Sequence, residues 1–547
     1  MSDTANLPIN PKRIGIKTLI LLVVLAVVWV ARPLFHGIIY PTVYSPGGLY
    51  VIGIPLVAGL VLFFLPPLSD NKSESLSKKG TYLGIVFVVG LILAFSLGFL
   101  GGMFEEKRLA QDAMEDAEEI DNFPEVNAEN PRIIPRAVAD VQTRGSVSYR
   151  QHQLGASDIA RAENGDLVWS YPIQPDQFRN QFSGNQRGVL LSDMTAMEDR
   201  ELQAYDEQDF KYGQNMFMHR SANWNLEKSD YWVQYRDDPV EFTHDGEAYM
   251  VFPKTGHEWH LLPVPHTTPT WEGVALVHTD GTIEHMSPEE ARNSEILDGQ
   301  RIYPLYNSQR YAESLEYRNG IINQLPIVGS FEGVIEPATL PAGAGNSQPF
   351  VIDLEGEEMS YTYAMEPAGE QTRGLDEVWL FDARTGEMRY YGTGGDTLLG
   401  PERAMGIIRS ADTRTNWDTE SSSGQFRVVE PVPTMINNEL WWHAKVVPVD
   451  NTDVTRNSFV NAHTEEVVEL EDTDSVVRFI SGENPDNIDS VTTEEPQSES
   501  DDAEVYIVIR DDEGNVVDRI PVESNQSFDI EVDTSDDRDS DNSTSTE

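Results

Sequence analysis

Residues 82–103 read YLGIVFVVGLILAFSLGFLGGM, and none of these 22 residues carries a charge. A helix needs about 20 apolar residues to cross the hydrocarbon core of a bilayer, so this run predicts a transmembrane helix. Residues 105–120 follow as EEKRLAQDAMEDAEEI, in which Leu109, Ala113 and Ala117 recur at every fourth position. This spacing is typical of a helix, and we expect a charged helical stalk that continues the span.

Two other uncharged apolar runs lie closer to the N-terminus. Residues 49–65 are numerous enough to cross a bilayer, and Pro55 within them is tolerated in a membrane helix. Residues 18–31 form a shorter run, and the sequence leaves open whether it spans the bilayer fully. We expect three transmembrane helices within residues 1–104.

Positive charges predict the orientation of these helices. Two flanks are rich in Lys and Arg, whereas the loop between the first two runs holds only Arg32. The flanks precede the first run and follow the second, with Lys12, Arg13, Lys17, Lys72, Lys78 and Lys79. Because cytoplasmic loops carry such an excess, we predict a multi-pass protein of a cell or virion membrane. Its N-terminus is then cytoplasmic, and the domain after Met103 is extracytoplasmic.

The composition excludes several classes of function. The 547 residues hold 39 Lys and Arg against 91 Asp and Glu, a net charge of −52, yet 39% are hydrophobic, as in a folded protein. There is no Cys, which excludes disulfides, thiol catalysis, Cys-ligated zinc and iron–sulfur clusters. A surface this acidic repels phosphate backbones, so we expect no nucleic-acid partner.

The acidic surface is also poor in lysine. Compact, strongly hydrated carboxylates keep a surface soluble where salt screens their repulsion, whereas Lys adds a long apolar stem. The pattern resembles the acidic proteomes of haloarchaea and their viruses, which implies a halophilic, archaeal origin. After Phe104 the sequence holds only Lys107, Lys211, Lys228, Lys254 and Lys445.

From about residue 130 to residue 480, short runs rich in Val, Ile, Tyr, Trp and Thr alternate with Gly, Asp and Asn turns. This pattern predicts strands. Helix-like stretches occur at residues 135–141, 287–292 and 401–408, and Ser287 before Pro288 has the character of an N-cap. We therefore predict an α+β protein, with three N-terminal transmembrane helices followed by a mostly antiparallel β ectodomain of repeated helix-plus-meander modules.

Two sequence elements repeat along this ectodomain. Residues 164–169 and 358–363 are each echoed 81 residues later, at residues 245–250 and 439–444. A strand, polar turn and second strand recur at residues 274–284, 378–388 and 458–467. In the middle copy Asp382 and Thr385 can bind neighbouring backbone N–H groups, and Gly386 supplies a positive φ. The last copy has Glu465 and Glu466 where Thr-Gly-Glu is expected, which leaves its turn geometry open.

A helix followed by a small antiparallel meander, closed by the Asp-x-x-Thr-Gly-Glu turn of residues 382–387, resembles the PepSY-like module of extracytoplasmic bacterial proteins. The whole layout, with the stretch from residue 209 to 253, resembles uncharacterised multi-span membrane proteins of bacteria and archaea that carry such repeats. The PepSY resemblance implies restraint of peptidases or binding of extracytoplasmic ligands, and it brings no established active-site residues.

Changes of composition set the expected boundaries. The ectodomain is predicted to hold four modules, and beyond residue 481 the chain becomes rich in Asp, Glu, Ser and Thr with one strand-like island. The island reads as a hairpin at residues 504–510 and 516–521, with residues 527–532 as a third strand. The predicted parts are a membrane anchor at 1–104, a stalk at 105–129, modules at 130–205, 206–300, 301–400 and 401–480, an acidic linker at 481–502, a small β unit at 503–533 and an acidic tail at 534–547.

The sequence holds few signs of catalysis. It lacks Gly-x-Ser-x-Gly, a phosphate-binding Gly-Lys-Ser/Thr loop and His-Glu-x-x-His. Six of its eleven His lie between residues 244 and 285, which we interpret as exposed imidazoles rather than a metal site. The sequence His257-Glu-Trp-His260 has its second His one residue too early for a zinc protease helix, and prolines follow it. The weaker alternative is a metal site at His257, His260 and His266.

Tryptophans on predicted strands are expected to pack in the core. The pair Trp441 and Trp442 is the exception, because adjacent strand residues point to opposite faces. We expect at least one of the two to be exposed, as part of an aromatic platform for a sugar or a peptide.

These observations predict a membrane-anchored surface or envelope protein with no catalysis, no cofactor and no metal. Besides the lipid bilayer, its expected partners are proteins or surface glycans outside the membrane, and self-association is left open. One alternative is an extracytoplasmic regulator or inhibitor of a peptidase or secretion system. The second is a metal-dependent hydrolase that uses the histidines of residues 244–285.

Overall fold

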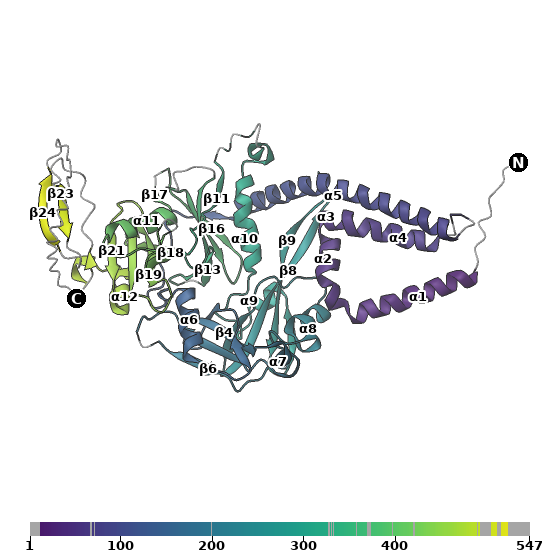
Figure 1. The fold of residues 1–547 in the computed structure, drawn as a ribbon, viewed down its shortest axis with the longest axis horizontal. Helices are drawn as coiled ribbons and strands as arrows, with labels where there is room; N and C mark the ends of the chain where they lie inside the picture. Colours follow the sequence, from purple (N-terminus) through teal and green to yellow (C-terminus); the bar gives the residue numbers. More distant parts are fainter. Residues whose placement is uncertain are drawn as a thin grey trace, which may run out of the picture. The chain divides into compact units, whose positions relative to one another are not determined.

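The computed structural model shows two compact units, Met1–Thr493 and Glu494–Glu547. It describes residues 11–65, 68–69, 72–198, 200–325, 329, 331, 333–356, 358–368, 374–395, 398–419, 422–488, 491–492, 505–510 and 516–522. Among the described residues, the first unit contains the apolar helices, four large sheets and one two-stranded sheet, and the second contains one hairpin (Figure 1).

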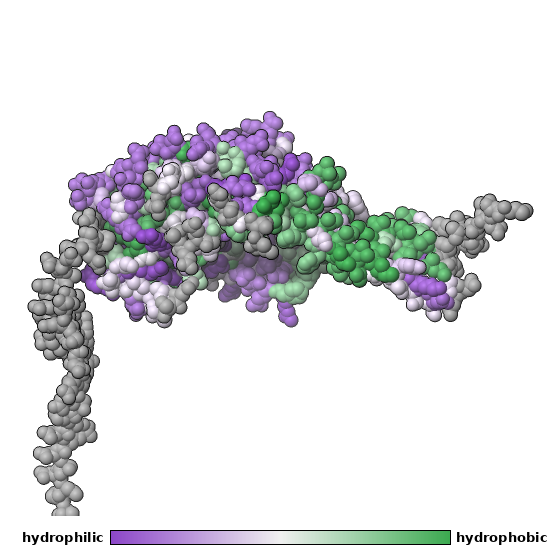
Figure 2. Space-filling view, turned by 90° about the horizontal axis from the view of Figure 1, so that it is seen from above, coloured by the Kyte–Doolittle hydropathy of each residue, from purple (hydrophilic) through white to green (hydrophobic). Residues whose placement is uncertain are grey.

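Apolar helices make up the N-terminal part of the first unit. Within the described residues, Pro46–Phe64 and Ser73–Asp116 are long and apolar enough to cross a membrane. A third crossing is added if the bent pair Gly15–Val30 and Arg32–Tyr44 counts as one span. Hydrophobic residues gather over this part of the molecule (Figure 2). The helices are α1 (Pro11–Val30), α2 (His36–Tyr44), α3 (Pro46–Gly48), the π-helix η2 (Leu49–Gly53), α4 (Ile54–Phe64) and α5 (Lys72–Asp116).

The three apolar runs of the sequence lie almost entirely in these helices, and the chain turns directly after the first run. The chain bends by 91° between α1 and α2. Pro33 lies at the bend in the short 3-10 helix Arg32–Phe35, where a proline cannot continue α-helical hydrogen bonding. At the opposite end of α1, Lys17 Nζ donates to the carbonyl of Phe63 in α4, so this end lies beside the C-terminal end of α4.

Helix α5 is continuous from the apolar run into the ectodomain, as predicted, and it ends at Asp116. It is not a free stalk, because Leu109, Ala110 and Ala113 are completely buried. Directly after it, β1 (Glu118–Glu119) pairs in parallel with β16 (Met388–Gly392). Helix α5 therefore runs from its apolar stretch into the packed interior of the β-rich part of the first unit.

The first two sheets are antiparallel and follow one another in the chain. The first has the order β2-β4-β5-β6 with β3 also on β4, and the second has the order β10-β9-β8-β7. The strands of the first sheet are β2 (His152–Leu154), β3 (Asp158–Arg161), β4 (Leu167–Pro175), β5 (Val189–Asp193) and β6 (Leu202–Tyr205), with helices α6 (Arg136–Ser146) and α7 (Phe178–Ser183). Those of the second are β7 (Val240–His244), β8 (Glu247–His260), β9 (His266–His278) and β10 (Ile283–Met286), with α8 (Ala222–Ser229) and α9 (Pro288–Arg292).

The other two large sheets follow the same manner of pairing. The third has the order β1-β16-β15-β13-β11 with β12 also on β13, and the fourth runs β18-β19-β20-β21-β22. The third contains β11 (Ile335–Pro337), β12 (Phe350–Asp353), β13 (Met359–Pro367), β15 (Glu377–Asp382) and β16 (Met388–Gly392), after α10 (Leu305–Ser314); β14 (Gly374–Leu375) pairs with β17 (Leu398–Leu399). The fourth contains β18 (Phe426–Ile436), β19 (Glu439–Pro448), β20 (Arg456–Asn461), β21 (Val467–Leu470) and β22 (Val491–Thr492), with α11 (Pro401–Ala411) and α12 (Thr473–Ile480). Together these elements confirm a mixed α and β protein with mostly antiparallel sheets.

Local signals in the sequence account for several helix ends and turns. Ser287 caps α9 in a complete capping box with Glu290. In the β15–β16 turn Asp382 Oδ1 accepts from the N–H groups of Arg384 and Thr385, at 2.8 and 2.7 Å. Asn461 accepts in the same way from His463 and Thr464 in the β20–β21 turn. There Glu465 adopts a φ of +64°, so it takes the left-handed conformation that Gly386 supplies in the other turn.

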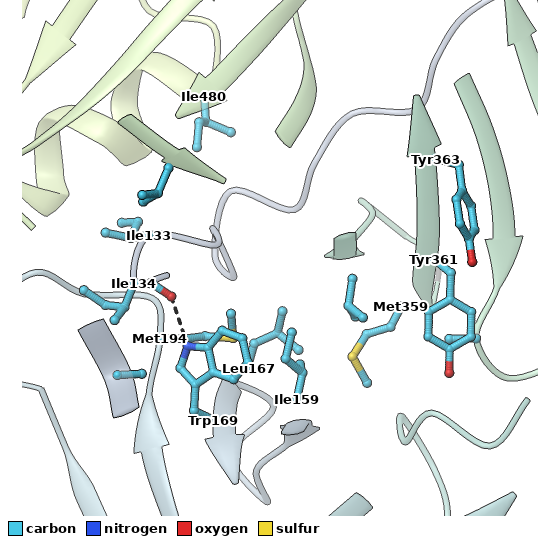
Figure 3. Close-up of a cluster of buried hydrophobic side chains, with 14 of the residues drawn as sticks. Ile133, Ile134, Ile159, Leu167, Trp169, Met194, Met359, Tyr361, Tyr363 and Ile480 are labelled. Atoms are coloured by element: carbon cyan, nitrogen blue, oxygen red, sulfur yellow. Dashed lines mark hydrogen bonds between the residues drawn. The ribbon is translucent and has the colours of Figure 1, made fainter. Parts of the chain in front are cut away.

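Three hydrophobic clusters hold the first unit together. One joins the first and second sheets, and another joins the third and fourth. The central cluster collects residues of α5, of the first, third and fourth sheets and of α12. Within it Trp169 Nε1 donates to the carbonyl of Ile134 at 3.0 Å, and Met359 and Tyr361 approach from the third sheet (Figure 3).

Buried charges also tie the sheets to one another. Arg132 lies in the connection before α6, and its Nε and Nη2 donate to Glu430 Oε2 of β18 at 3.0 and 2.8 Å. Its Nη1 donates to the carbonyl of Val351 in β12, and its guanidinium lies over the rings of Trp169 and Phe350. One side chain therefore contacts the first, third and fourth sheets.

The second unit is described only as the antiparallel hairpin of β23 (Val505–Arg510) and β24 (Val516–Val522). The hairpin predicted from the sequence is therefore present. The third strand predicted at residues 527–532 lies outside the described residues.

Candidate functional site

The two tryptophans proposed as a binding platform are both buried. Trp441 is 6% exposed and Trp442 is 0% exposed. Trp441 packs edge to face on Phe479 of α12, and Trp442 Nε1 donates to the carbonyl of Leu399 at 2.7 Å. The expectation of an exposed indole is wrong, because β19 is a central strand whose two faces are both covered.

Two of the three histidines of the alternative metal site lie together, because the ring centroids of His260 and His266 are 5.1 Å apart, but His257 bonds Tyr40 instead. His257 Nδ1 lies 2.9 Å from the hydroxyl of Tyr40, His260 Nε2 lies 2.8 Å from Thr268 Oγ1, and His266 Nδ1 lies 2.7 Å from the carbonyl of Val264. Among the residues that the structure describes, no group of three or more His, Asp or Glu is placed to hold a metal ion. The expectation that the six imidazoles are exposed holds only for His285, since His266 is buried and the other four are half-buried.

His257 has a structural task instead. Its ring joins β8 to α2 through the contact with Tyr40. Burial, with Arg236 and Arg310 nearby, lowers the pKa of His257 to about 4. The imidazole is therefore neutral at neutral pH and binds Tyr40 as an uncharged partner.

A cavity of about 120 Å³ lies where the first, second and third sheets meet. Asp158 forms an ion pair with Arg301, and Asp237 accepts from the N–H of Tyr306 at 3.0 Å. Burial raises the pKa of Asp237 to about 6. No His lines the cavity. Ser157 is its one serine, and the hydroxyl of Ser157 accepts from Arg136 Nε. The lining is Arg136, Ser157, Asp158, Asp237, Asp238, Val240, Pro253, Arg301, Leu305 and Tyr361.

This cavity offers a buried ion pair and a proton-exchanging carboxyl but no nucleophile and base in contact. Acyl or phosphoryl transfer needs a nucleophile activated by a neighbouring base. The ion pair instead links Asp158 of β3 to Arg301 in the segment before α10, and Tyr361 lines the cavity from β13 of the third sheet. We therefore assign the cavity to the core of the fold.

Outside the core, three phenylalanines form an exposed cluster. Phe178 and Phe182 lie one turn apart on α7, and Phe217 follows from the loop before the short 3-10 helix Met218–Arg220. The ring centroids of Phe182 and Phe217 are 4.0 Å apart, and those of Phe178 and Phe182 are 4.9 Å apart. Phe178 is 66% exposed and Phe182 is 45% exposed. We call Phe178, Phe182, Phe217 and the exposed Met218 the aromatic island.

Polar contacts hold the two segments of the island together. Phe217 N donates to the carbonyl of Gln181 at 3.0 Å, and Gln181 Nε2 donates to Asn215 Oδ1 at 2.9 Å. Arg220 Nη1 donates to the carbonyl of Phe182 at 2.8 Å. The rings are thus held in one place by hydrogen bonds beneath them rather than by burial, so their outer faces remain available.

The island interrupts the acidic character of the protein. Residues 177–192 and 210–226 contain no Asp or Glu, although Asp and Glu make up 91 of the 547 residues. The same two stretches carry Arg179, Arg187, Lys211 and Arg220. Contiguous exposed apolar surface with Arg at its edge is typical of a protein-binding site.

Sequence reasoning missed this site. In the sequence, the segment from residue 209 to 219 shows only a family resemblance, and residues 178–182 show no motif. The detectable signal was the lack of acidic residues in two stretches of a very acidic chain. Their proximity in space could not be read from the sequence.

No known protein family, curated protein or solved structure matches this chain.

Proposed function

We propose that this protein is a membrane-mounted binding protein without catalysis of its own, and that the aromatic island is the surface that holds its protein partner. The observation that carries the proposal is the cluster of the exposed Phe178 and Phe182 with the half-buried Phe217, in two stretches without Asp or Glu in an otherwise acidic chain. Burying these rings against a partner removes apolar area from water, which is the main driving force for association.

Arg179 and Arg220 favour a partner with an acidic surface. Arg179 lies in one segment of the island and Arg220 in the other. Opposite charges across an interface speed the encounter of two proteins and help to fix how they align. At the salt concentrations that an acidic surface suits, long-range attraction is screened. The aromatic contacts then supply most of the affinity, and the two arginines supply selectivity.

The mounting on the membrane is the second part of the proposal. Residues of the first loop contact the ectodomain: Trp259 Nε1 donates to the carbonyl of Val43, and Thr267 Oγ1 donates to that of Tyr44. These contacts require the loop and the ectodomain to share one side of the membrane. We therefore propose that α1 also crosses, that the N-terminus is cytoplasmic, and that the ectodomain is extracytoplasmic. Protease added to intact cells should digest the chain after Met103 and spare the N-terminus.

We also propose that the ectodomain consists of four PepSY-like modules. A helix precedes each large sheet in the chain, with α6, α8, α10 and α11 in these positions. The turn shared by Asp382 and Asn461 closes equivalent hairpins in the third and fourth sheets. The lysine-poor, acidic surface supports a halophilic origin, and tertiary structure that is lost in dilute salt and kept in molar salt would support it further.

The experiment compares the proteins that co-purify with wild type and variants when each is isolated from its own membranes in molar salt. The double variant Phe178→Asp with Phe182→Asp should no longer co-purify with one specific protein that co-purifies with the wild type. Two carboxylates cannot be buried in an apolar contact. Phe331→Asp is the matched control, since Phe331 is also exposed but lies outside the island. Near-UV circular dichroism checks that both variants are folded. Equal retention by all three proteins would contradict the proposal.

A further inference from the structure

We propose that the tip of the β8–β9 hairpin, residues 261–265, enters the interface of the lipid bilayer beside α5. The ligand of this surface is the bilayer itself, on the side that carries the ectodomain. This contact is separate from the transmembrane helices and from the aromatic island.

The tip has the chemistry of a membrane-inserting loop. Leu261 is 70% exposed and Leu262 is 83% exposed. A single exposed leucine is ordinary, but two adjacent ones at the end of a long hairpin form an apolar projection. Residues 259–271 contain no Asp, Glu, Lys or Arg, so no charge has to leave water when the tip enters the headgroup region.

The hairpin lies against the end of the longest apolar helix. A Cβ added to Gly101 would lie 2.8 Å from the carbonyl oxygen of Pro265, so the backbone of the tip touches α5 as closely as a glycine permits. The ring of Phe104 lies 6.4 Å from that of His266, where β9 begins. Gly101 and Phe104 mark the end of the charge-free run of residues 82–103. The tip is therefore placed at the level where this helix leaves the hydrocarbon core.

Aromatic side chains surround the same region. Trp259 precedes the tip and donates to Val43, and Tyr44 lies 6.4 Å from the ring of Trp232. Trp232 is itself exposed. Tryptophan and tyrosine gather at membrane interfaces because one end of each is apolar and the other forms hydrogen bonds. The tip thus continues an interfacial belt whose other members lie between the first loop and the ectodomain, which is why we assign the bilayer as its occupant.

The test uses the absence of cysteine from the chain. Leu262→Cys in the full-length protein, reconstituted in phosphatidylcholine nanodiscs, is labelled with an environment-sensitive fluorophore. Val449→Cys is the control, because Val449 is exposed at the far end of β19, in the fourth sheet. Lipids that carry a nitroxide near the glycerol backbone quench a probe in the interface, and iodide in the buffer quenches a probe in water.

For Leu262→Cys we expect blue-shifted emission, strong quenching by the nitroxide lipid and several-fold weaker quenching by iodide than for Val449→Cys. The control should show the opposite pattern. Full access of the Leu262→Cys probe to iodide without lipid quenching would overturn the proposal. Protection from both quenchers together with disulfide-linked dimers of unlabelled Leu262→Cys would also overturn it, because a second copy of the chain would then cover the tip.

Discussion

Arg132 and Glu430 are 298 residues apart in the chain and form a buried ion pair at 2.8 Å in the centre of the ectodomain. Glu430 lies in the bulge of β18 with a φ of +46°, and its other oxygen accepts from the backbone N–H of Arg136. Both partners are almost completely buried. The pair fixes the connection before α6 against the fourth sheet, which holds the sheets in one rigid body.

Removing one partner should therefore cost far more than a surface ion pair. Arg132→Met leaves Glu430 charged and buried, and we expect a loss of about 3–5 kcal/mol in the free energy of unfolding. The double variant Arg132→Met with Glu430→Leu should lose less than Arg132→Met alone, because the buried Glu430 carboxylate no longer remains without its arginine. Denaturant titration of the detergent-solubilised protein in molar salt measures both values. A double variant that is no more stable than Arg132→Met alone would contradict this account.

Lys445 of β19 gives a pH dependence of the opposite sense to that of a paired lysine. It is completely buried, and burial lowers its pKa to about 7, although Glu430 nearby favours the charged form. Between pH 7 and its ordinary pKa of 10.5 the unfolded chain binds a proton that the folded protein has released. Stability from this group should therefore rise with pH over that window. Lys445→Met should flatten the slope of unfolding free energy against pH, and an unchanged slope would show that Lys445 is not the cause.

Gly386 should tolerate substitution poorly because two effects act on it together. Its φ is +77°, and a Cβ would lie 2.3 Å from the ring of Tyr303. Gly356 has a φ of +70° but no atom within 4 Å of its Cβ position. Gly356→Ala should cost about 1–2 kcal/mol for the left-handed conformation alone, and Gly386→Ala should cost clearly more. Equal shifts in the denaturation midpoint would exclude the contact with Tyr303 as a cause.

Removing each of the two histidines of β8 should change the stability of the protein by different amounts. His257→Ala leaves the buried hydroxyl of Tyr40 without its partner, so we expect a loss of about 1–3 kcal/mol in stability. His260 is half-exposed, its Nε2 bonds Thr268 and its ring lies beside that of His266, so His260→Ala leaves no buried group without a partner and should change stability by less than about 0.5 kcal/mol. Thermal unfolding at matched salt compares them, and similar losses from the two would contradict the role of His257 in joining β8 to α2.

Local patterns predicted the parts of the fold that local chemistry determines. The charge-free run of residues 82–103 lies in α5, Ser287 caps α9, and Asp382 closes its turn, because each of these depends on neighbours within a few residues. The Arg132–Glu430 pair could not be predicted in this way. Its partners are brought together only when three sheets pack, and neither residue stands out in the sequence.

The binding residues show the same limit more sharply. Trp441 and Trp442 were expected to have one exposed face because strand residues alternate. Alternation places them on opposite faces of β19, but it does not say that α12 covers one face and the segment around Leu399 covers the other. Conversely, Phe178 and Phe217 lie 39 residues apart and meet only through the contact of α7 with the loop before Met218.

The central claim is that the aromatic island holds a protein partner, and site-specific photocross-linking tests it most directly. A photoreactive phenylalanine analogue placed at Phe178, and separately at Phe331 as the control, is irradiated in intact membranes at molar salt. We predict that Phe178 forms a cross-link to one protein, that Arg179→Glu weakens this cross-link, and that Phe331 does not form it. Cross-links from Phe178 only to lipid, or to the same proteins as from Phe331, would contradict the claim.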